Sequence, residues 1–504
     1  MLAYIFLFVL GLSPVLQAVF DLPLQLAFQR AVLLGCLAWF LIRACGAGLP
    51  RGFTGKKLYP LWAAAGLSFV SLLASPFKGN IFNEWGNYAA GLLIFIFAAF
   101  LNKEERGKVE RTIVWGAWLV FAVSLLQAFA LGNFLARPPL TNLNALALYA
   151  VMAIPLALDR RNWPLTGALV ILVVWTQSLG AVLAGLVTAG FYAASRFKGR
   201  ELKENAWLLL GLAALAAPVF YLLQADSVAG RLAWWRSALE MFAARPLAGF
   251  GHSSFTWAQA AFQPEGAFRE HAVYAHNYYL EFLAENGLPA ALAWFWLLFA
   301  AARAKTGLLK YSVIAALVHS ALDFGLSVPA NFWLFCWLLS SPSEEYHTAP
   351  PGTGQDSPSP QPLPGDGPCL PRFSRRAAGA AVVFAALLLA ALAGLDFRSL
   401  SFEKARGRAA AAAGRKEFPA AEAELRPALG AELFKAPALE LLGSLSFADK
   451  SADPGFRAAV YYEMALLENR YSASAWRALR HIYSQPGLEG SAAGLERRRL
   501  EVFK

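Results

Sequence analysis

The chain has 504 residues, of which 58% are hydrophobic and only 15% are charged. Soluble globular proteins are about half apolar and about a quarter charged, so this composition excludes an ordinary soluble domain and predicts an all-α, polytopic membrane protein. The net charge of +11 needs no nucleic-acid partner, because basic residues that flank membrane spans follow from topology.

Apolar runs long enough to cross a bilayer recur along the chain. The first begins directly after Met1 and lacks both a basic n-region and a small-residue cleavage site, which favours an uncleaved span. The block 165–194 is too long for one span, and we split it near Ser178-Leu179-Gly180. We predict about 12–13 spans. Besides the two halves of that block, they are Leu2–Phe20, Leu24–Ile42, Leu58–Leu73, Ile81–Leu101, Thr112–Leu131, Leu143–Leu158, Ala206–Leu223, Tyr278–Ala302, Tyr311–Leu326, Phe332–Leu339 and Ala377–Leu395.

Charge in the short connections predicts the orientation of the bundle. Positive residues stay on the cytoplasmic side, and they cluster in alternate connections, whereas the intervening loops carry little beyond Lys78 and Arg137. This register places the N-terminus inside and a large loop, 224–277, outside. The basic connections are 43–57, 103–111, 160–161, 196–203, 303–310 and 372–376.

These features predict a transmembrane domain at 1–340, followed by three further parts. Segment 341–376 is rich in Pro, Ser and Gly and is expected to be a disordered cytoplasmic linker. A last span follows at 377–395. Residues 401–504 regain helical periodicity and form an extracytoplasmic helical domain. The four cysteines have no disulfide or metal-ligand spacing.

The C-terminal domain shows a repeat-like pattern. Trp476-x-x-Leu479-x-x-x-Tyr483 matches the first helix of a tetratricopeptide repeat, and Leu439-x-x-Leu442-Gly443 echoes it upstream. Such repeats often present a concave binding surface, here for a possible protein partner. The alternative is a plain helical bundle.

The outward loop is polar and rich in aromatic residues, with no obvious regular structure. Long connections of this kind are functional or disordered, and this one has too many aromatic residues to be a disordered tether. It contains three of the six histidines, His252, His271 and His276. His276 lies where the loop ends and the next span begins, at the mouth of the bundle.

These residue types suit transfer from a diphosphate-activated lipid donor to a hydroxyl acceptor. A neutral histidine near pH 7 accepts a proton from a hydroxyl. Arg231 and Arg236 can bind phosphate oxygens in bidentate fashion, so no metal or other cofactor is needed.

Structural interpretations remain open for the same residues. A histidine at a span end is often an interfacial anchor, Arg231 and Arg236 can bind lipid headgroups, and Trp234 with Trp235 can form an interfacial belt. His271 and His276 are five residues apart, with no carboxylate cluster beside them, which argues against a metal site.

The stretch 230–295 resembles the signature region of the O-antigen ligase and O-antigen polymerase superfamily. The resemblance rests on Arg231, on Pro246-Leu247-Ala248-Gly249-Phe250-Gly251, and on His276-Asn277-Tyr278-Tyr279-Leu280 followed by Glu285-Asn286-Gly287. A later segment, His319-Ser320-Ala321-Leu322-Asp323-Phe324, is similar to another family motif.

The resemblance implies a glycosyltransferase of the bacterial inner membrane. Its donor would be a glycan on undecaprenyl diphosphate, and its acceptor a lipid such as lipid A-core, another repeat unit, or a protein side chain. His276 would be the base and Arg231 a donor-diphosphate ligand, with Arg236 as a second. The supporting residues would be Asn277, Glu281, His319 and Asp323.

The chain departs from the family pattern at one position. Members often carry Ser-Arg-Gly in the middle spans, where this chain has Ser178-Leu179-Gly180, and Arg236 or Arg137 would have to replace the missing guanidinium. A polysaccharide transporter, with the loop as a gate, is a different class. It predicts paired interrupted helices and intramembrane charges, whereas the sequence offers few beyond Arg30, His319 and Asp323. A non-enzymatic scaffold would leave the His276 region unexplained.

Overall fold

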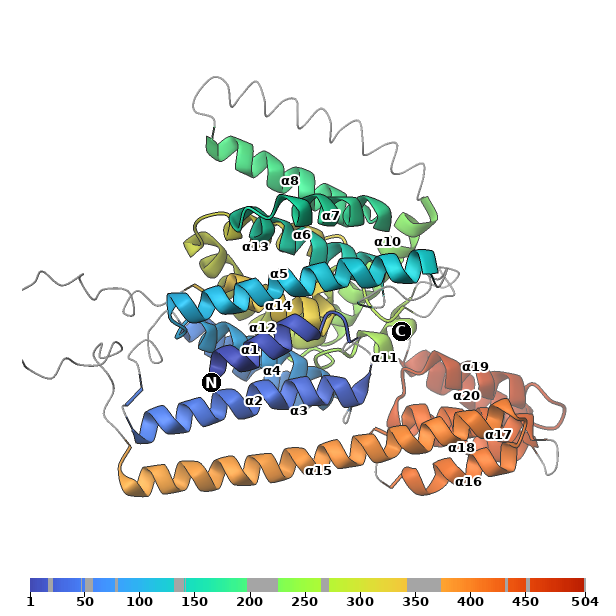
Figure 1. The fold of residues 1–504 in the computed structure, drawn as a ribbon. Helices are drawn as coiled ribbons and strands as arrows, with labels where there is room; N and C mark the ends of the chain where they lie inside the picture. The colour runs from blue at the N-terminus through green and yellow to red at the C-terminus, as the bar shows by residue number, and fades with distance from the viewer. Residues whose placement is uncertain are drawn as a thin grey trace, which may run out of the picture. The chain divides into compact units, whose positions relative to one another are not determined.

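The computed structural model describes residues 1–16, 21–46, 48–49, 58–77, 80–130, 140, 142–196, 225–263, 272–341, 373–430, 434–449 and 454–502. Within these ranges the chain is helical and contains no strand, which confirms the predicted all-α class (Figure 1). It divides into two compact units. The first comprises Met1–Ala65, Gly86–Ala225 and Leu292–Leu388, and the second Gly66–Trp85, Asp226–Ala291 and Leu389–Lys504.

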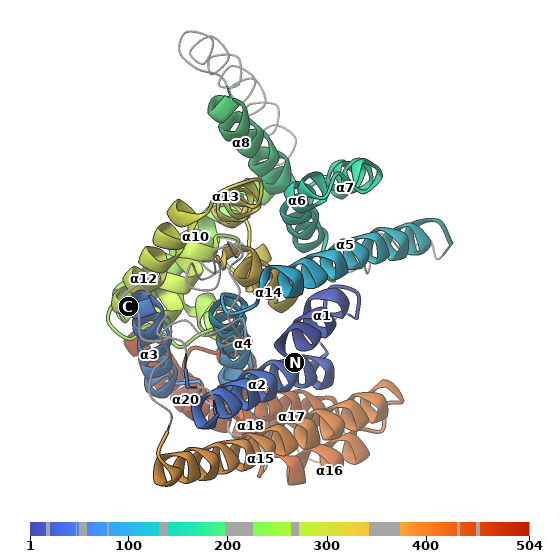
Figure 2. The same cartoon turned by 60° about the vertical axis from the view of Figure 1, so that its left-hand side comes forward.

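The first unit is a bundle of apolar helices. Helix α1 packs on α5, α6 packs on α7, and α13 packs on both α6 and α8 (Figure 2). The helices of this unit are α1 (Leu2–Leu12), α2 (Leu22–Cys45), α5 (Lys103–Leu125), α6 (Leu143–Asp159), α7 (Trp163–Thr176), α8 (Leu179–Arg196), α13 (Leu309–Ser320) and α14 (Pro329–Leu339). Four further helices run from one unit into the other: α3 (Tyr59–Ala74), α4 (Asn80–Ala98), α12 (Tyr278–Ala304) and α15 (Arg375–Gly414).

Several described helices are long and apolar enough to cross a membrane. They are Leu22–Cys45, Lys103–Ala130, Tyr278–Ala304 and Arg375–Gly414. Shorter apolar helices coincide with most of the other predicted spans, whereas 206–223 lies outside the described residues. The split of the block 165–194 is confirmed: α7 ends at Thr176, the next residue, Gln177, has a left-handed φ of 53°, and α8 begins at Leu179.

Helix α14 is the buried centre of the first unit. All of its residues are buried, and at eleven residues it is about 17 Å long, which is shorter than a hydrocarbon core of about 30 Å. Two cations satisfy its C-terminal end: Arg106 donates to Ser340 Oγ at 3.2 Å, and Lys305 Nζ donates to the Ser340 carbonyl at 2.5 Å. Positive charge at a helix C-terminus is stabilising.

The second unit contains most of the segment predicted as an outward loop. The expectation that this segment lacks regular structure is wrong for its first part, because Ala225–Ala244 forms helix α10. A short helix, α11 (Phe255–Ala258), and a 3₁₀ turn, Gln259–Phe262, follow. The polar residues of α10 hid a helix because they interrupt the apolar pattern that identifies membrane helices.

The C-terminal helices belong to the second unit. Helix α15 is continuous over 40 residues, so the predicted boundary between the span 377–395 and the domain 401–504 falls inside one helix. Helices α16 (Phe418–Ala428), α17 (Ala436–Ala448), α18 (Pro454–Glu468), α19 (Ala473–Tyr483) and α20 (Glu489–Val502) follow. Each packs on the next, as in repeat proteins.

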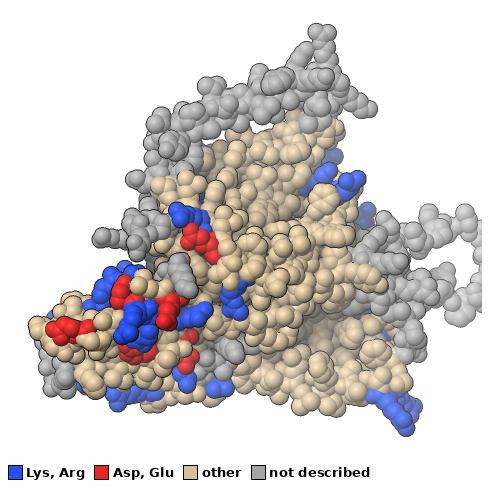
Figure 3. All heavy atoms as spheres, turned by 180° about the vertical axis from the view of Figure 1, so that it is seen from behind, with Lys and Arg blue, Asp and Glu red and all other residues tan. Residues whose placement is uncertain are grey.

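The C-terminal helices have an apolar interior and a charged surface. The pattern residues Leu439, Trp476 and Leu479 share one buried cluster. Acidic and basic side chains gather on the outside, far more densely than over the rest of the view in Figure 3. Their assignment to tetratricopeptide repeats stays a prediction.

Candidate functional site

His276 occupies a constrained backbone position directly before α12. Its φ is 51°, a left-handed conformation that costs a non-glycine residue on the order of 1–3 kcal/mol and persists only where the surroundings impose it. Asn277 follows as the N-cap of α12, and its side-chain oxygen accepts from the backbone N–H groups of Tyr279 and Leu280, each at 3.1 Å. The chain after His276 is therefore fixed to the first turn of α12.

The chain before His276 is held by a buried carboxylate. Glu281, which is only 4% exposed, accepts the backbone N–H of Ala275 at 2.7 Å. The carboxylate sits one turn into the same helix that Asn277 caps. Two side chains of α12 thus clamp the residues on either side of His276, which explains how its backbone strain is maintained.

Helix α10 contacts His276 through adjacent tryptophans. The Trp234 indole stacks on the imidazole with ring centroids 4.9 Å apart and an interplanar angle of 23°. The Trp235 Nε1–H donates to the His276 carbonyl at 3.4 Å. These indoles were expected to form an interfacial belt, whereas the structure makes them neighbours of the candidate base.

The two candidate donor ligands on α10 lie on different faces. Arg231 is half-buried and precedes Trp234 by one helical turn, so it shares the face that meets His276. Arg236 is about 140° further around the helix. Its exposed guanidinium pairs with Glu240, with Nε 2.7 Å from Oε1. The structure therefore groups Arg231, and not Arg236, with Trp234 and His276.

The Pro246–Gly251 turn docks onto a break in α12. Gly287 has φ 76° and ψ 170° and interrupts the helix. The exposed backbone groups are then bound by the turn: Leu288 N–H donates to the Pro246 carbonyl at 2.8 Å, and Gly251 N–H donates to the Glu285 carbonyl at 2.7 Å.

Glycine is required at both contact points of this junction. A Cβ on Gly249, whose φ is 62°, would lie 2.2 Å from the Glu285 carbonyl oxygen. A Cβ on Gly287 would lie 2.3 Å from the Leu247 carbonyl oxygen. The turn and the Glu285-Asn286-Gly287 motif are therefore two halves of one structure, although the sequence shows them only as separate motifs.

Buried polar groups complete the junction. The Glu285 carboxylate accepts the N–H groups of Ser253 at 2.7 Å and Phe255 at 2.9 Å. Asn286 Nδ2 lies 3.4 Å from Nδ1 of His252. Burial lowers the pKa of His252 to about 4, so this imidazole is neutral at physiological pH. Its contact with Asn286 makes it part of the junction between the turn and α12.

Serines of α3 and of the residue directly after it also hold the junction, and they were not predicted from the sequence. Ser68 Oγ donates to Asn286 Oδ1 at 2.7 Å, Ser71 Oγ donates to the Ala248 carbonyl at 2.5 Å, and Ser75 Oγ donates to the Phe250 carbonyl at 2.5 Å. Ser68 and Ser71 are three residues apart on one face of α3, and Ser75 directly follows the end of this helix. The sequence contained a signal for these contacts, because serines that recur every three or four residues within an apolar run indicate a polar stripe that binds another segment.

An acidic environment surrounds Tyr274, two residues before His276. Burial, and after it the charges of Glu84, Glu281 and Glu285, raise the pKa of the Tyr274 phenol well above its usual value. Tyr274 is therefore neutral and is not a base at physiological pH.

His319 and Asp323 lie in the first unit, at the end of α13. His319 is fully buried and packs against glycines: a Cβ on Gly180 would lie 3.4 Å from its Cδ2, and one on Gly325 would lie 3.2 Å from its Cε1. Asp323 Oδ1 accepts the N–H of Phe324 at 2.8 Å. The structure thus joins the Ser178-Leu179-Gly180 segment to the second family-like motif.

Within the described ranges, no three His, Cys, Asp or Glu side chains are grouped so that they can hold a metal ion. His271 and Arg137, which the sequence analysis considered as a metal ligand and as a substitute for the missing arginine, lie outside those ranges.

Residues 165–295 match the family model described as O-antigen ligase, which includes helix α10, the Pro246–Gly251 turn and His276. A search of curated proteins finds no match to the chain. Together with the apolar helices, the family match supports a membrane-integral enzyme of the O-antigen ligase or polymerase type that acts on lipid-linked glycans.

Proposed function

We propose, from the premise that residues 165–295 are an O-antigen ligase domain, that this protein moves a saccharide from undecaprenyl diphosphate to a hydroxyl acceptor. The acceptor is lipid A-core or a similar lipid, and the reaction takes place at the outer face of the bacterial inner membrane. The observation that carries the proposal is the imposed left-handed backbone of His276, which sits between α12 and the Arg231 face of α10.

In the proposed reaction His276 is the general base. The acceptor hydroxyl oxygen attacks the anomeric carbon of the donor sugar, and its proton passes to the imidazole. The bond between that carbon and the diphosphate oxygen breaks, and both electrons leave with the diphosphate. Strain of the backbone at His276 supports the role because it fixes the direction of the imidazole before substrate binds.

Arg231 is the proposed ligand of the donor diphosphate. A guanidinium can bind two phosphate oxygens at once, and preorganised cations stabilise the charge that grows on the leaving group. Arg236 is the second proposed ligand. Because it pairs with Glu240, the diphosphate would have to displace that carboxylate, so we assign Arg231 the larger role.

The direct test supplies the purified protein with labelled undecaprenyl-diphosphate glycan, a chelator and separate acceptors. We expect label on a lipid A-core acceptor, undiminished by the chelator. Label on a growing chain of repeat units would instead identify a polymerase, and label on a protein would identify an oligosaccharyltransferase. Absence of any transfer, with the donor intact and the protein folded, would remove the proposal.

A further inference from the structure

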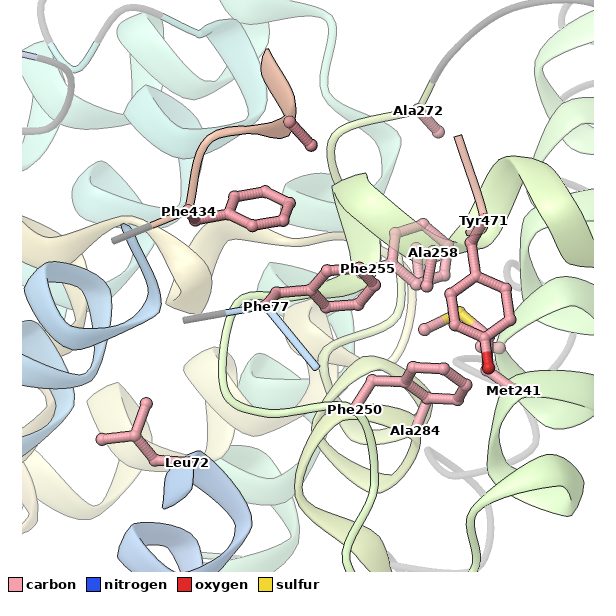
Figure 4. Close-up of a cluster of buried hydrophobic side chains, with 13 residues drawn as sticks. Leu72, Phe77, Met241, Phe250, Phe255, Ala258, Ala272, Ala284, Phe434 and Tyr471 are labelled. Atoms are coloured by element: carbon pink, nitrogen blue, oxygen red, sulfur yellow. The ribbon is translucent and has the colours of Figure 1, made fainter. Parts of the chain in front are cut away.

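Aromatic side chains of the C-terminal helices pack against the Pro246–Gly251 turn. The buried cluster contains Phe77 from the segment after α3, Phe250 from the turn, Phe255 from α11, and Phe434 and Tyr471 from connections between the C-terminal helices, as Figure 4 shows. All of these residues belong to the second unit. The contact brings residues near 77, 434 and 471 together with the segment 250–255, which lies close in sequence to His276.

Tyr471 is the centre of this contact. It is 6% exposed, and its ring lies 5.4 Å from that of Phe250 at 77°, 5.7 Å from that of Phe262 and 6.2 Å from that of Phe77. Edge-on contacts of aromatic rings, such as those with Phe250 and Phe77, stabilise the packing beyond the burial of the rings alone. The Tyr471 hydroxyl accepts from Arg470 at 2.7 Å, so the ring, and not the hydroxyl, makes the contact with the turn.

Phe434 makes a second contact from a different connection. Its ring lies 5.6 Å from that of Phe77 and 5.4 Å from that of Trp257. Asn469 Nδ2 donates to the Trp257 carbonyl at 3.4 Å. Phe434 precedes α17, and Tyr471 precedes α19, so two alternate connections of the helical series meet the same partner segment.

The contact continues through hydrogen bonds to α12, the helix that follows His276. The Phe250 N–H donates to the Ala284 carbonyl at 3.2 Å, and the next residue is bound to Glu285. Glu285 lies one helical turn after Glu281, whose carboxylate holds the residue before His276. The turn that Tyr471 covers therefore binds the same helical segment that sets the His276 backbone.

We propose that Tyr471 and Phe434 are positioning residues of the transferase. The C-terminal helical domain then serves as an internal brace for the active-site segment, and this face of it is occupied by the chain itself. The proposal deepens the function proposed above and rests on it for the activity measurements. A protein partner of the C-terminal helical domain would therefore bind a different face of it.

Hydrogen exchange of the full-length protein tests the brace without any assay of transfer. Tyr471→Ala should speed exchange in residues 246–258 more than in α17 and α18. Tyr462→Ala is the matched control, because Tyr462 is 7% exposed but packs within the C-terminal helices, against Gly443. It should speed exchange in α17 and α18 more than in residues 246–258. Wild-type exchange of residues 246–258 in Tyr471→Ala would overturn the proposal.

Transfer kinetics test the consequence for catalysis. Small displacements of a catalytic group cost up to about a hundredfold in rate, so Tyr471→Ala should lower kcat by about tenfold or more while the donor KM stays within about twofold. Tyr471→Phe keeps the ring and should restore both values. If exchange rises as expected but kcat does not fall, the brace exists but does not position the site, and the positioning role is overturned. If wild type itself shows no transfer, the proposed function fails while the exchange result still stands.

Discussion

His276 and His319 are held in opposite ways. His276 sits on a strained backbone, stacked on an indole and flanked by residues that α12 clamps with hydrogen bonds. His319 lies within the regular helix α13, fully buried and packed against two glycines. Strain that is maintained by several polar contacts is typical of functional sites, whereas tight packing without strain is what cores require. On this ground we propose the chemistry for the first histidine and a supporting role for the second.

The junction beneath His276 gives the largest expected effect. Gly249→Ala forces a Cβ to within 2.2 Å of the Glu285 carbonyl oxygen on a left-handed backbone, so the turn must separate from α12. We expect transfer to fall by about a hundredfold or more, because the catalytic group loses its placement. Gly167→Ala is the control, since a Cβ there meets nothing within 4 Å. Equal activity of the two variants would break the link between the junction and the site.

The two arginines of α10 should differ in their effect on the donor. Arg231→Ala removes charge-assisted hydrogen bonds worth about 1.5–3 kcal/mol, so the donor KM should rise by about tenfold or more. Arg236→Ala should raise it less, because that guanidinium already pairs with Glu240. The KM for the lipid-linked glycan measures both. A larger effect of Arg236→Ala would reverse our assignment.

The second histidine should act through stability. His319→Ala leaves a cavity between α13 and its neighbours, which we expect to cost about 2–3 kcal/mol of the free energy of unfolding, with a smaller loss of transfer than at His276. Thermal unfolding in detergent, followed beside activity, separates the effects. Full stability combined with complete loss of transfer would show that His319 shares the chemistry.

His252 should affect only the pH dependence of stability. Its pKa is lowered to about 4 in the folded protein by burial, against about 6.5 when unfolded. As pH falls, the imidazole is protonated in the unfolded state before it is protonated in the folded state. The contribution of His252 to the free energy of unfolding is therefore fully present above about pH 6.5 and is lost as pH falls toward 4. His252→Asn should flatten this slope and leave transfer near neutral pH almost unchanged. A slope identical to that of wild type would contradict the assignment.

The sequence predicted the local parts of this site better than the contacts between them. His276-Asn277 at the start of α12 was identifiable because a capping residue and an apolar span follow in order. The serines of α3 were missed because their partners are about 180–220 residues away, and no local pattern reports such contacts. The same limit hid Tyr471 and Phe434, whose aromatic rings are indistinguishable in sequence from core residues of a helical repeat.

The extents of helices α10 and α15 were not predicted, because their local composition does not reflect their surroundings in the folded protein. Helix α10 carries Arg231, Arg236 and Glu240 among its apolar residues, so it resembled a loop between spans. The last span was predicted to end where hydropathy falls after Leu395, whereas α15 contains no proline and continues to Gly414. A fall in hydropathy marks a change of surroundings and not the end of a helix.

Replacement of His276 by asparagine tests whether the imidazole is the general base. Asparagine tolerates the left-handed backbone, so His276→Asn removes the imidazole while the Asn277 cap and the Glu281 contact remain. The account predicts wild-type hydrogen exchange in residues 272–288, an unchanged donor KM, and a fall in kcat of about 10²–10⁴-fold. His481→Ala, at an exposed histidine of the C-terminal helices, should behave as wild type. Transfer by His276→Asn at the wild-type rate would contradict the account.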